Sequence, residues 1–340
     1  MMQGTLDLEC APGARVGVMT EATLSPLVLG AMMFGTTIDE DTSFALLDRF
    51  VERGGVWIDT ADCYSFWASK TGRGGDSERV LGRWLAARPG VRDRVRIATK
   101  LGAEPLEPGS WPDRREGLSP EAVRAAFAGS LDRLGIDRVD LLWLHQEDRS
   151  VPIEDTVEAL AALPADRIGV SNHPAWLVER GRAHARAIGV QPFHALQLNA
   201  TYLRPRPGTL PPGVSHRFGV LSDEQADYAT EHGMELWAYT PLLSGAYDNP
   251  AKDIAEVYDH PGNAARLAVL DVVVSEVGAT RGQVVLAWLL SRGITPMLGG
   301  SKLDQLDSAF DGVALQLSAD QLERLDTPDR SAWAAPYAQR

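Results

Sequence analysis

The stretch 56-VWIDTADCYS-65 sets acidic residues and a tyrosine directly behind an apolar run. Val56, Trp57 and Ile58 are β-branched or aromatic residues of the kind that strands favour. Asp59 and Tyr64 follow them with no glycine or proline between. A buried strand that ends on such side chains needs an explanation, and the rest of the chain supplies one.

The same pattern recurs along the whole chain: a short apolar run, a loop, and then a longer segment with helical spacing. We predict eight strands, at 25–34, 56–61, 95–102, 139–145, 167–173, 193–199, 234–241 and 294–300. We predict helices at 41–53, 77–87, 120–134, 154–163, 175–188, 223–232, 264–277, 302–310 and 318–326. Ser119 before Pro120 is a typical helix start, and Gly135 after Leu134 is a typical helix stop.

The alternation of strands and helices predicts parallel strand pairing, and near-continuous apolar strands predict burial on both faces. Eight units in about 300 residues fit a (β/α)₈ TIM barrel of class α/β, with a doubly wound sheet as the alternative. No linker is evident, so residues 1–340 are expected to form a single domain. Four long connections, 65–76, 104–118, 201–221 and 243–263, are expected to lie on the C-terminal rim.

Composition narrows the class of protein. A formal net charge of −13 argues against a nucleic-acid partner, because phosphate binding needs a basic face. Two cysteines, Cys10 and Cys63, exclude a disulfide framework and favour a reducing, cytoplasmic setting. The first residues do not resemble a signal peptide, and the apolar run from Val284 is far shorter than the ~20 residues of a membrane span.

The seven histidines show no pair at ligand spacing, so no metal site is predicted. Cys63 is expected to be a packing residue.

Polar residues stand at the carboxyl ends of most predicted strands. They are Asp59 with Tyr64 after it, Lys100, His145, Ser171 with Asn172, Gln197 with Asn199, and Tyr239. In a barrel these ends meet on one rim, where active sites lie. Any one of these residues alone could be a solvated strand tip or a core side chain, but their joint occurrence predicts a site.

The residue types suit carbonyl chemistry. A tyrosine with a pKa of about 10 is a poor proton donor near neutrality, and a nearby ammonium lowers that value. Lys100 could supply the ammonium, Asp59 could hold it, and His145 could hydrogen-bond a substrate oxygen. None of these groups can supply hydride, so a nicotinamide cofactor is required. A barrel aldolase that forms a Schiff base on Lys100 is an alternative from the same residues.

Motifs in a fixed order strengthen the oxidoreductase hypothesis. The segments WIDTADCYS, DSERVLGRWL, IATK, VDLLWLH, IGVSN, QLN, AYTPLLSG and GGSKLDQL follow one another between residues 24 and 326. In these motifs the chain resembles the aldo-keto reductase superfamily. The resemblance implies NADPH-dependent reduction of an aldehyde or ketone, a small-molecule carbonyl. It implies a catalytic tetrad of Asp59, Tyr64, Lys100 and His145, with Tyr64 as the proton donor.

The resemblance also implies how NADP(H) is held. Ser171, Asn172 and Gln197 would bind the carboxamide, Tyr239 would stack on the nicotinamide, and Ser301 with Lys302 would meet the 2′-phosphate. The full expected cofactor set is Gly30, Met32, Asp59, Ser171, Asn172, Gln197, Tyr239, Leu242, Ser244, Gly245, Ser301, Lys302 and Gln305. Phe34, Phe66, Trp67 and Trp111 are expected to line the substrate pocket, and Trp143 is an aromatic that belongs either there or in the core.

Three departures from the family pattern are visible. Ala309 stands where many members carry an asparagine that contacts adenine. The passage before residue 168 is short, which predicts a truncated fourth helix, and the N-terminal hairpin of relatives is not evident. A different class of function stays open, because potassium-channel β-subunits share the barrel and bind the cofactor as regulatory modules. The sequence carries no signal for the oligomeric state.

Overall fold

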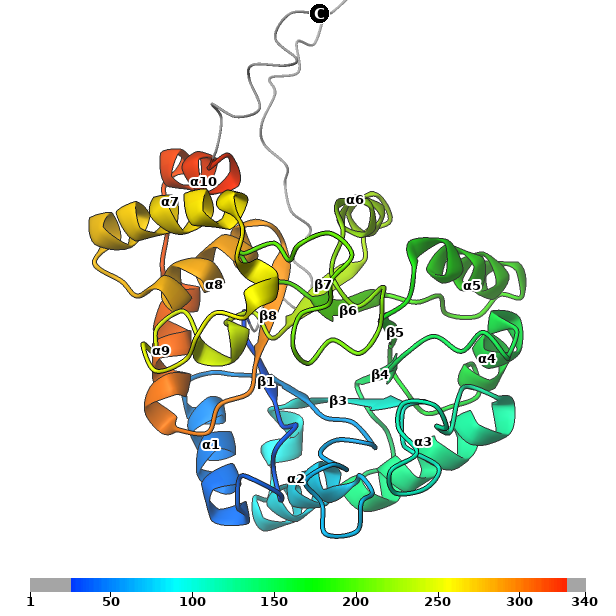
Figure 1. The fold of residues 1–340 in the computed structure, drawn as a ribbon. Helices are drawn as coiled ribbons and strands as arrows, with labels where there is room; N and C mark the ends of the chain where they lie inside the picture. The colour runs from blue at the N-terminus through cyan, green and yellow to red at the C-terminus, as the bar shows by residue number, and fades with distance from the viewer. Residues whose placement is uncertain (1–25, 329–340) are drawn as a thin grey trace, which may run out of the picture.

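The computed structural model describes residues 26–328, in which eight parallel strands close into a barrel ringed by helices (Figure 1). The strands are β1 Val28–Gly30, β2 Trp57–Asp59, β3 Arg96–Leu101, β4 Leu141–Leu144, β5 Ile168–Ser171, β6 Ala195–Asn199, β7 Glu235–Tyr239 and β8 Ile294–Leu298. Each strand pairs with its sequence neighbours, and β1 pairs with both β2 and β8. This closure confirms the predicted (β/α)₈ barrel and excludes the doubly wound sheet.

The helices pack around the strands. They are α1 Glu40–Glu52, α2 Asp76–Ala87, α3 Pro120–Leu134, α4 Ile153–Leu160, α5 Ala175–Ala187, α6 Asp223–Glu231, α7 Pro261–Val277, α8 Arg281–Ser291, α9 Leu303–Ala314 and α10 Ala319–Asp326. Short 3₁₀ turns are η2 Val91–Asp93, η3 Leu243–Gly245 and η4 Glu256–Tyr258. The helix α4 has only 8 residues, which confirms the predicted truncation. The long connections follow β2, β3, β6 and β7, so they leave the carboxyl ends of these strands as predicted.

Helix α8 was not predicted from the sequence. Residues 284–289 are buried without interruption, so this helix lacks the polar face that gives a surface helix its 3.6-residue period. Its start carries a capping box formed by Thr280 and Gln283. The predicted caps elsewhere are confirmed: Ser119 accepts a hydrogen bond from the Ala122 N–H, and Gly135 ends α3 in a left-handed conformation at φ 64°.

The barrel interior is filled by large and small side chains in alternation. Trp57, Trp143 and Trp237 lie inside, and Trp237 meets each of the other two rings edge-on at 5.2 Å. Gly169 lies opposite Trp143 in the strand register and leaves room for its ring. Trp143 is therefore a core residue and not part of a substrate pocket.

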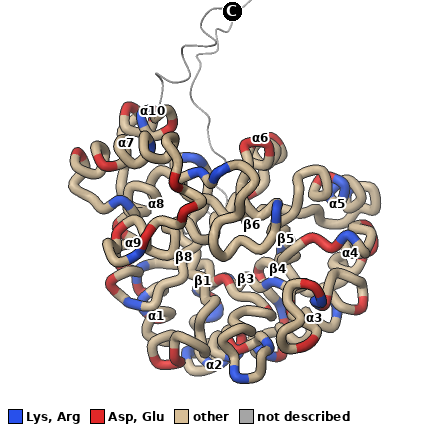
Figure 2. The backbone as a smooth tube through the Cα atoms, in the orientation of Figure 1, with Lys and Arg blue, Asp and Glu red and all other residues tan. Residues whose placement is uncertain are grey.

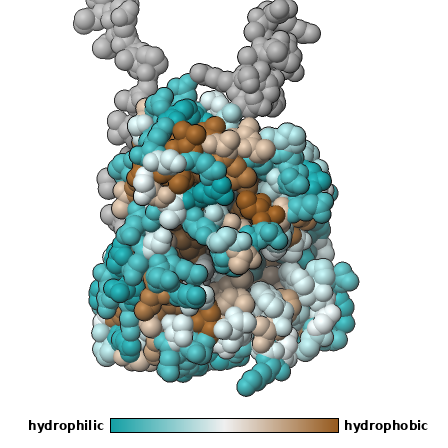
Figure 3. Space-filling model, turned by 60° about the vertical axis from the view of Figure 1, so that its left-hand side comes forward, coloured by the Kyte–Doolittle hydropathy of each residue, from teal (hydrophilic) through white to brown (hydrophobic). Residues whose placement is uncertain are grey.

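The outer surface carries charges of both signs, interspersed along the helices (Figure 2). The face that Figure 3 brings forward is mostly hydrophilic, with hydrophobic areas between the polar ones.

Within residues 26–328 no single helix is long and apolar enough to cross a membrane; α7 and α8 pass that test only as a pair, and they meet at a bend of 99°. The predictions about a signal peptide and an N-terminal hairpin, and Cys10, lie outside the described residues.

The tight packing of the interior yields a stability prediction. A methyl group on Gly169 would lie 2.4 Å from the Trp143 ring, so Gly169→Ala is expected to destabilise the fold by about 1–3 kcal/mol through overpacking. Gly129→Ala in α3 is the matched control, because its methyl meets only the flexible end of Arg133, and helix propensity predicts a gain of up to about 1 kcal/mol. Urea unfolding monitored by tryptophan fluorescence measures both changes. Equal midpoints for Gly169→Ala and the parent chain would contradict the packing described here.

Candidate active site

The period of two along each strand places the site directly above the packed interior. Asp59 follows Trp57, Lys100 follows Ala98, and His145 follows Trp143, each two residues further toward the carboxyl end. Because alternate residues of a strand share a face, these polar groups point into the same barrel mouth as the core residues below them. The barrel interior therefore forms the floor of the polar site.

Asp59, Lys100 and Tyr64 form a closed hydrogen-bonded triangle. The Lys100 ammonium forms a short ion pair with Asp59 Oδ2 and donates to the Tyr64 hydroxyl oxygen at 2.5 Å and to the Thr60 carbonyl at 2.9 Å. The Tyr64 hydroxyl in turn donates to Asp59 Oδ2 at 3.2 Å. Asp59 and Lys100 have no exposed surface, and Tyr64 is 8% exposed. The structure thus brings together three of the four predicted tetrad residues in direct contact.

Electrostatics in this triangle differ from the expectation in one respect. Burial first, and the Asp59 carboxylate second, raise the pKa of Tyr64 well above its usual range. The predicted lowering by Lys100 is wrong for the site as the structure has it, because the carboxylate that holds the lysine also faces the phenol and disfavours a second anion. The phenol therefore holds its proton more tightly than a free tyrosine does, and the Lys100 ammonium is the group that can stabilise the phenolate once the proton has left.

His145 lies beside Tyr64, with the two ring centroids 5.8 Å apart and nearly perpendicular. Its Nδ1 lies 3.4 Å from the Cys63 sulfur. Burial lowers the pKa of His145 and raises the pKa of the Cys63 thiol, so a neutral imidazole faces a neutral thiol. In the tautomer in which the thiol donates to Nδ1, the ring proton is on Nε2, which has no hydrogen-bond partner within residues 26–328. His145 can therefore offer Nε2–H to a substrate oxygen.

The predicted carboxamide-binding residues belong to the same network. Gln197 donates to Asp59 Oδ1 at 3.2 Å, and Ser171 donates to the Gln197 carbonyl at 2.8 Å. Asn172 donates to the His145 carbonyl at 2.9 Å and accepts from the Tyr239 hydroxyl at 3.0 Å. The amide and hydroxyl groups of Ser171, Asn172 and Gln197 are chemically suited to bind a nicotinamide carboxamide. The Tyr239 ring, held in place through its hydroxyl, is suited to lie against the nicotinamide ring.

The predicted phosphate end lies where β8 leads into α9. Ser301, Lys302 and Gln305 are exposed, and Gln305 Oε1 accepts from the Ser301 N–H at 3.4 Å. Lys302 forms no ion pair with any residue from 26 to 328, and it precedes the first turn of a 12-residue helix. A free ammonium beside a helix N-terminus fits a phosphate group.

The segment after β7 contains one candidate that the sequence did not indicate. Leu242, Ser244 and Gly245 lie in and beside η3, where Ser244 and Gly245 both have positive φ. Lys252 folds back and donates to the Ser244 carbonyl at 2.5 Å. Lys252 is one of only four lysines among the 33 Lys and Arg residues, and two of the other three, Lys100 and Lys302, are predicted site residues. The rarity of lysine is therefore the signal by which the sequence could have drawn attention to Lys252.

At the end of β1, Gly30 pairs in register with Asp59. Met32, just beyond, is 41% exposed, and its carbonyl accepts a hydrogen bond from Ser65. Gly30 and Met32, both predicted to contact the cofactor, therefore lie beside β2 and the loop after it, which carry Asp59 and Tyr64.

The predicted substrate aromatics separate into two groups. Phe66 and Trp111 pack against the small cluster that contains Tyr64, and Phe66 also contacts Trp67, which is 57% exposed. Phe34 has no exposed surface and belongs to the main core between barrel and helices. The prediction that Phe34 lines a substrate pocket is wrong, because the turn after β1 directs its side chain inward.

A closed barrel with a buried Asp–Lys–Tyr triangle at its mouth defines a TIM-barrel oxidoreductase. The chain belongs to the aldo/keto reductase family, whose model matches residues 26–329. It is 30% identical to norsolorinic acid reductase B of Aspergillus parasiticus over 325 residues, which cover 89% of this chain and 80% of the relative. It is 28% identical to an aryl-alcohol dehydrogenase of Pestalotiopsis microspora, covering 93% and 80% of the two chains.

The solved structures agree on the fold. The crystal structure of the thermostable aldo-keto reductase Tm1743 with the inhibitor epalrestat superposes with a TM-score of 0.68. It is 21% identical in sequence, and the match covers 89% of this chain and 94% of the other. This likeness supports the barrel alone.

The buried ion pair yields a second prediction. Lys100→Met leaves the Asp59 carboxylate without its cation and is expected to cost about 3–5 kcal/mol of stability. The double variant Asp59→Asn/Lys100→Met removes both charges, so its cost should fall below the sum of the two single costs by about 2 kcal/mol. Denaturant unfolding of the four chains measures this coupling. Additive costs would show that the two charges are not energetically paired.

Proposed function

We propose that the protein reduces an aldehyde or ketone to an alcohol with NADPH. The observation that carries this proposal is the triangle of Lys100, Asp59 and Tyr64, with the free Nε2 side of His145 beside it. A protonated phenol and an imidazole N–H at one barrel mouth are the groups that a carbonyl oxygen needs as it becomes an alcohol.

When bound, the nicotinamide supplies hydride to the carbonyl carbon. His145 orients the carbonyl oxygen through Nε2–H, and Tyr64 gives that oxygen its proton. The phenolate that this leaves lies 2.5 Å from the Lys100 nitrogen, so the ammonium stabilises the new anion. Asp59 keeps the lysine charged and aimed at the phenol.

The cofactor is proposed to lie across the rim. Ser171, Asn172 and Gln197 bind the carboxamide, Tyr239 stacks on the ring, and Gly30, Met32 and Asp59 border it. Leu242, Ser244 and Gly245 follow the pyrophosphate, and we add Lys252 as a cation at this position. Ser301, Lys302 and Gln305 bind the 2′-phosphate, which favours NADPH over NADH.

A carbonyl attached to an aromatic ring is the proposed substrate class. Phe66 and Trp111 pack beside Tyr64, Phe66 contacts both tryptophans, Trp67 and Trp111, and the three rings offer flat apolar faces. The relatives include norsolorinic acid reductases and an aryl-alcohol dehydrogenase. We further propose that the chain works as one domain in the cytoplasm, because two cysteines in 340 residues fit a reducing compartment.

The proton donor gives the third prediction. Tyr64→Phe removes the hydroxyl and is expected to lower kcat for carbonyl reduction by a factor of about 10² or more. NADPH binding, followed by quenching of tryptophan fluorescence, should stay close to that of the parent chain. The control is Tyr228→Phe on α6, whose hydroxyl donates to Glu179, away from the barrel mouth, and which should keep its activity. A Tyr64→Phe enzyme with most of its rate would sink the assignment, and a parent chain that binds NADPH without turnover would favour a regulatory module.

The phosphate end gives the fourth prediction. Lys302→Ala is expected to weaken NADPH binding about tenfold or more and to leave NADH binding nearly unchanged, because only NADPH carries the 2′-phosphate. Lys70→Ala, in the exposed 65–76 connection, is the matched control and should change neither affinity. Equal losses for both cofactors would move the 2′-phosphate away from Lys302.

A further inference from the structure

Asp62 is a buried carboxylate without a hydrogen-bond donor. It is 4% exposed, and neither of its oxygens has an N–H or O–H partner within residues 26–328. The charged side chains around it include three other acids, of which Glu116 lies within hydrogen-bond reach, and Glu78 and Glu104 are the other two. Two adjacent carboxyl groups in such a place need either a shared proton or a cation.

The neighbouring acids already have partners of their own. Glu116 accepts from the Gly102 N–H, and Glu104 accepts from the Gly74 N–H. Glu78 accepts from Thr99 and pairs with Arg133 at 2.6 Å. Asp62 therefore has no N–H or O–H donor within residues 26–328, and it lies within hydrogen-bond reach of Glu116, another acid with which it can only share a proton.

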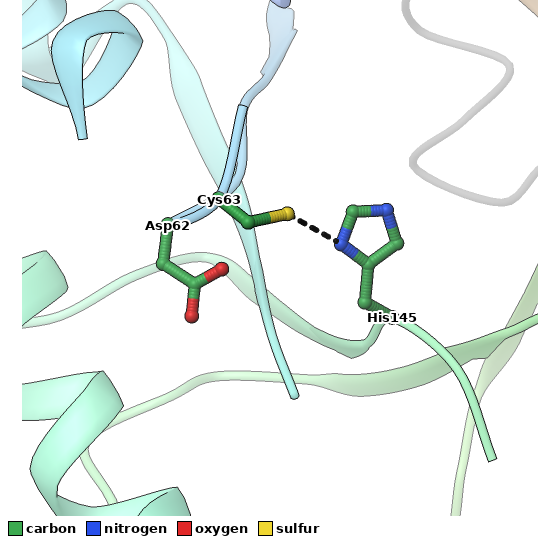
Figure 4. A group of neighbouring side chains, drawn as sticks. All are labelled: Asp62, Cys63 and His145. Atoms are coloured by element: carbon green, nitrogen blue, oxygen red, sulfur yellow. Dashed lines mark hydrogen bonds between the residues drawn. The ribbon is translucent and has the colours of Figure 1, made fainter. Parts of the chain in front are cut away.

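Two further metal-ligand atoms lie next to Asp62. The Cys63 sulfur and His145 Nδ1 are 3.4 Å apart, and a carboxylate oxygen of Asp62 lies within 4.8 Å of both. Figure 4 shows the three side chains converging from two segments, with one Asp62 oxygen turned toward the sulfur and the ring. The sequence could not indicate this set, because residues 62 and 63 follow β2 whereas residue 145 follows β4, and only the folded barrel brings them together.

The geometry is close to that of a tetrahedral site. Bond lengths of about 2.3 Å to sulfur and 2.0 Å to nitrogen place two zinc ligands about 3.5 Å apart, which matches the observed sulfur–nitrogen distance. In a tetrahedral site the Asp62 oxygen would lie about 3.3 Å from the nitrogen and about 3.5 Å from the sulfur, so it would have to move closer than the present limit of 4.8 Å. A thiolate, an imidazole nitrogen and a carboxylate oxygen form a donor set that suits a borderline ion such as Zn²⁺ and leaves a fourth position open.

We propose that Asp62, Cys63 and His145 form a binding site for Zn²⁺ or a similar divalent ion, and that its occupation stops carbonyl reduction. Binding releases the thiol proton to solvent and gives Asp62 a cationic partner. The ion takes His145 Nδ1 at the present sulfur–nitrogen distance and fixes the ring there, so Nε2–H can no longer adjust to a substrate oxygen beside Tyr64. The inhibitory half of this proposal rests on the proposed function, whereas the binding half does not.

Cobalt binding tests the site independently of turnover. Untagged, metal-free full chain is titrated with Co²⁺, a spectroscopic stand-in for zinc, and the near-ultraviolet thiolate-to-cobalt charge-transfer band is followed. We expect one ion per chain, loss of the band in Cys63→Ser, and at least tenfold weaker binding in Asp62→Asn. Cys10→Ser is the matched control and should keep the full band. No band in the parent chain, or an unchanged band in Cys63→Ser or Asp62→Asn, overturns the site.

Zinc inhibition tests the second half. Equimolar Zn²⁺ is expected to lower NADPH oxidation with an aryl aldehyde more than tenfold, EDTA should restore it, and Cys10→Ser should behave as the parent chain does. Full turnover with zinc bound overturns the inhibitory half. If the metal-free chain reduces no carbonyl at all, the proposed function fails, while the cobalt band still decides the metal site.

Discussion

The ion pair between Lys100 and Asp59 is the constraint around which the rest of the site is arranged. Both charges have no exposed surface, and a buried charge is tolerated only when it is paired and hydrogen-bonded. The pair joins β3 to β2, and its remaining contacts bind Tyr64, the Thr60 carbonyl and Gln197. Satisfying two buried charges therefore also positions the phenol and links it to the residues proposed to hold the cofactor.

The strand period connects this site to the stability of the barrel. One set of inward positions carries tryptophans and small residues, and the next set carries Asp59, Lys100 and His145. The apolar layer excludes water beneath the charges, which strengthens their interaction and keeps the phenol protonated. The tryptophans pack edge-on below the site, so a methyl on Gly169, 2.4 Å from the Trp143 ring, would disturb the layer on which the proposed catalytic groups stand.

Much of this architecture could be predicted from the sequence because strand and cap signals are local. The eight strands and the start of α3 follow from periodicity and capping residues, whereas the short α4 was expected from the comparison with the family pattern. Helix α8 escaped because burial on all sides removes the polar face that reveals a helix. Phe34 was misplaced because residue type does not tell whether a turn directs a ring inward or outward. The raised pKa of Tyr64, the fold-back of Lys252 and the contact of Cys63 with His145 depend on distances between segments far apart in the chain, which no local pattern contains.

We propose that a buried lysine–aspartate pair holds a protonated phenol against the reacting end of a dinucleotide. A crystal structure of the full chain with NADP⁺ and a carbonyl inhibitor would show whether these groups meet. We expect the Tyr64 hydroxyl within hydrogen-bond distance of both the Lys100 nitrogen and the inhibitor oxygen, with the nicotinamide beside Tyr239. A dinucleotide bound away from the barrel mouth, or a Tyr64 hydroxyl turned away from Lys100, would rule this arrangement out.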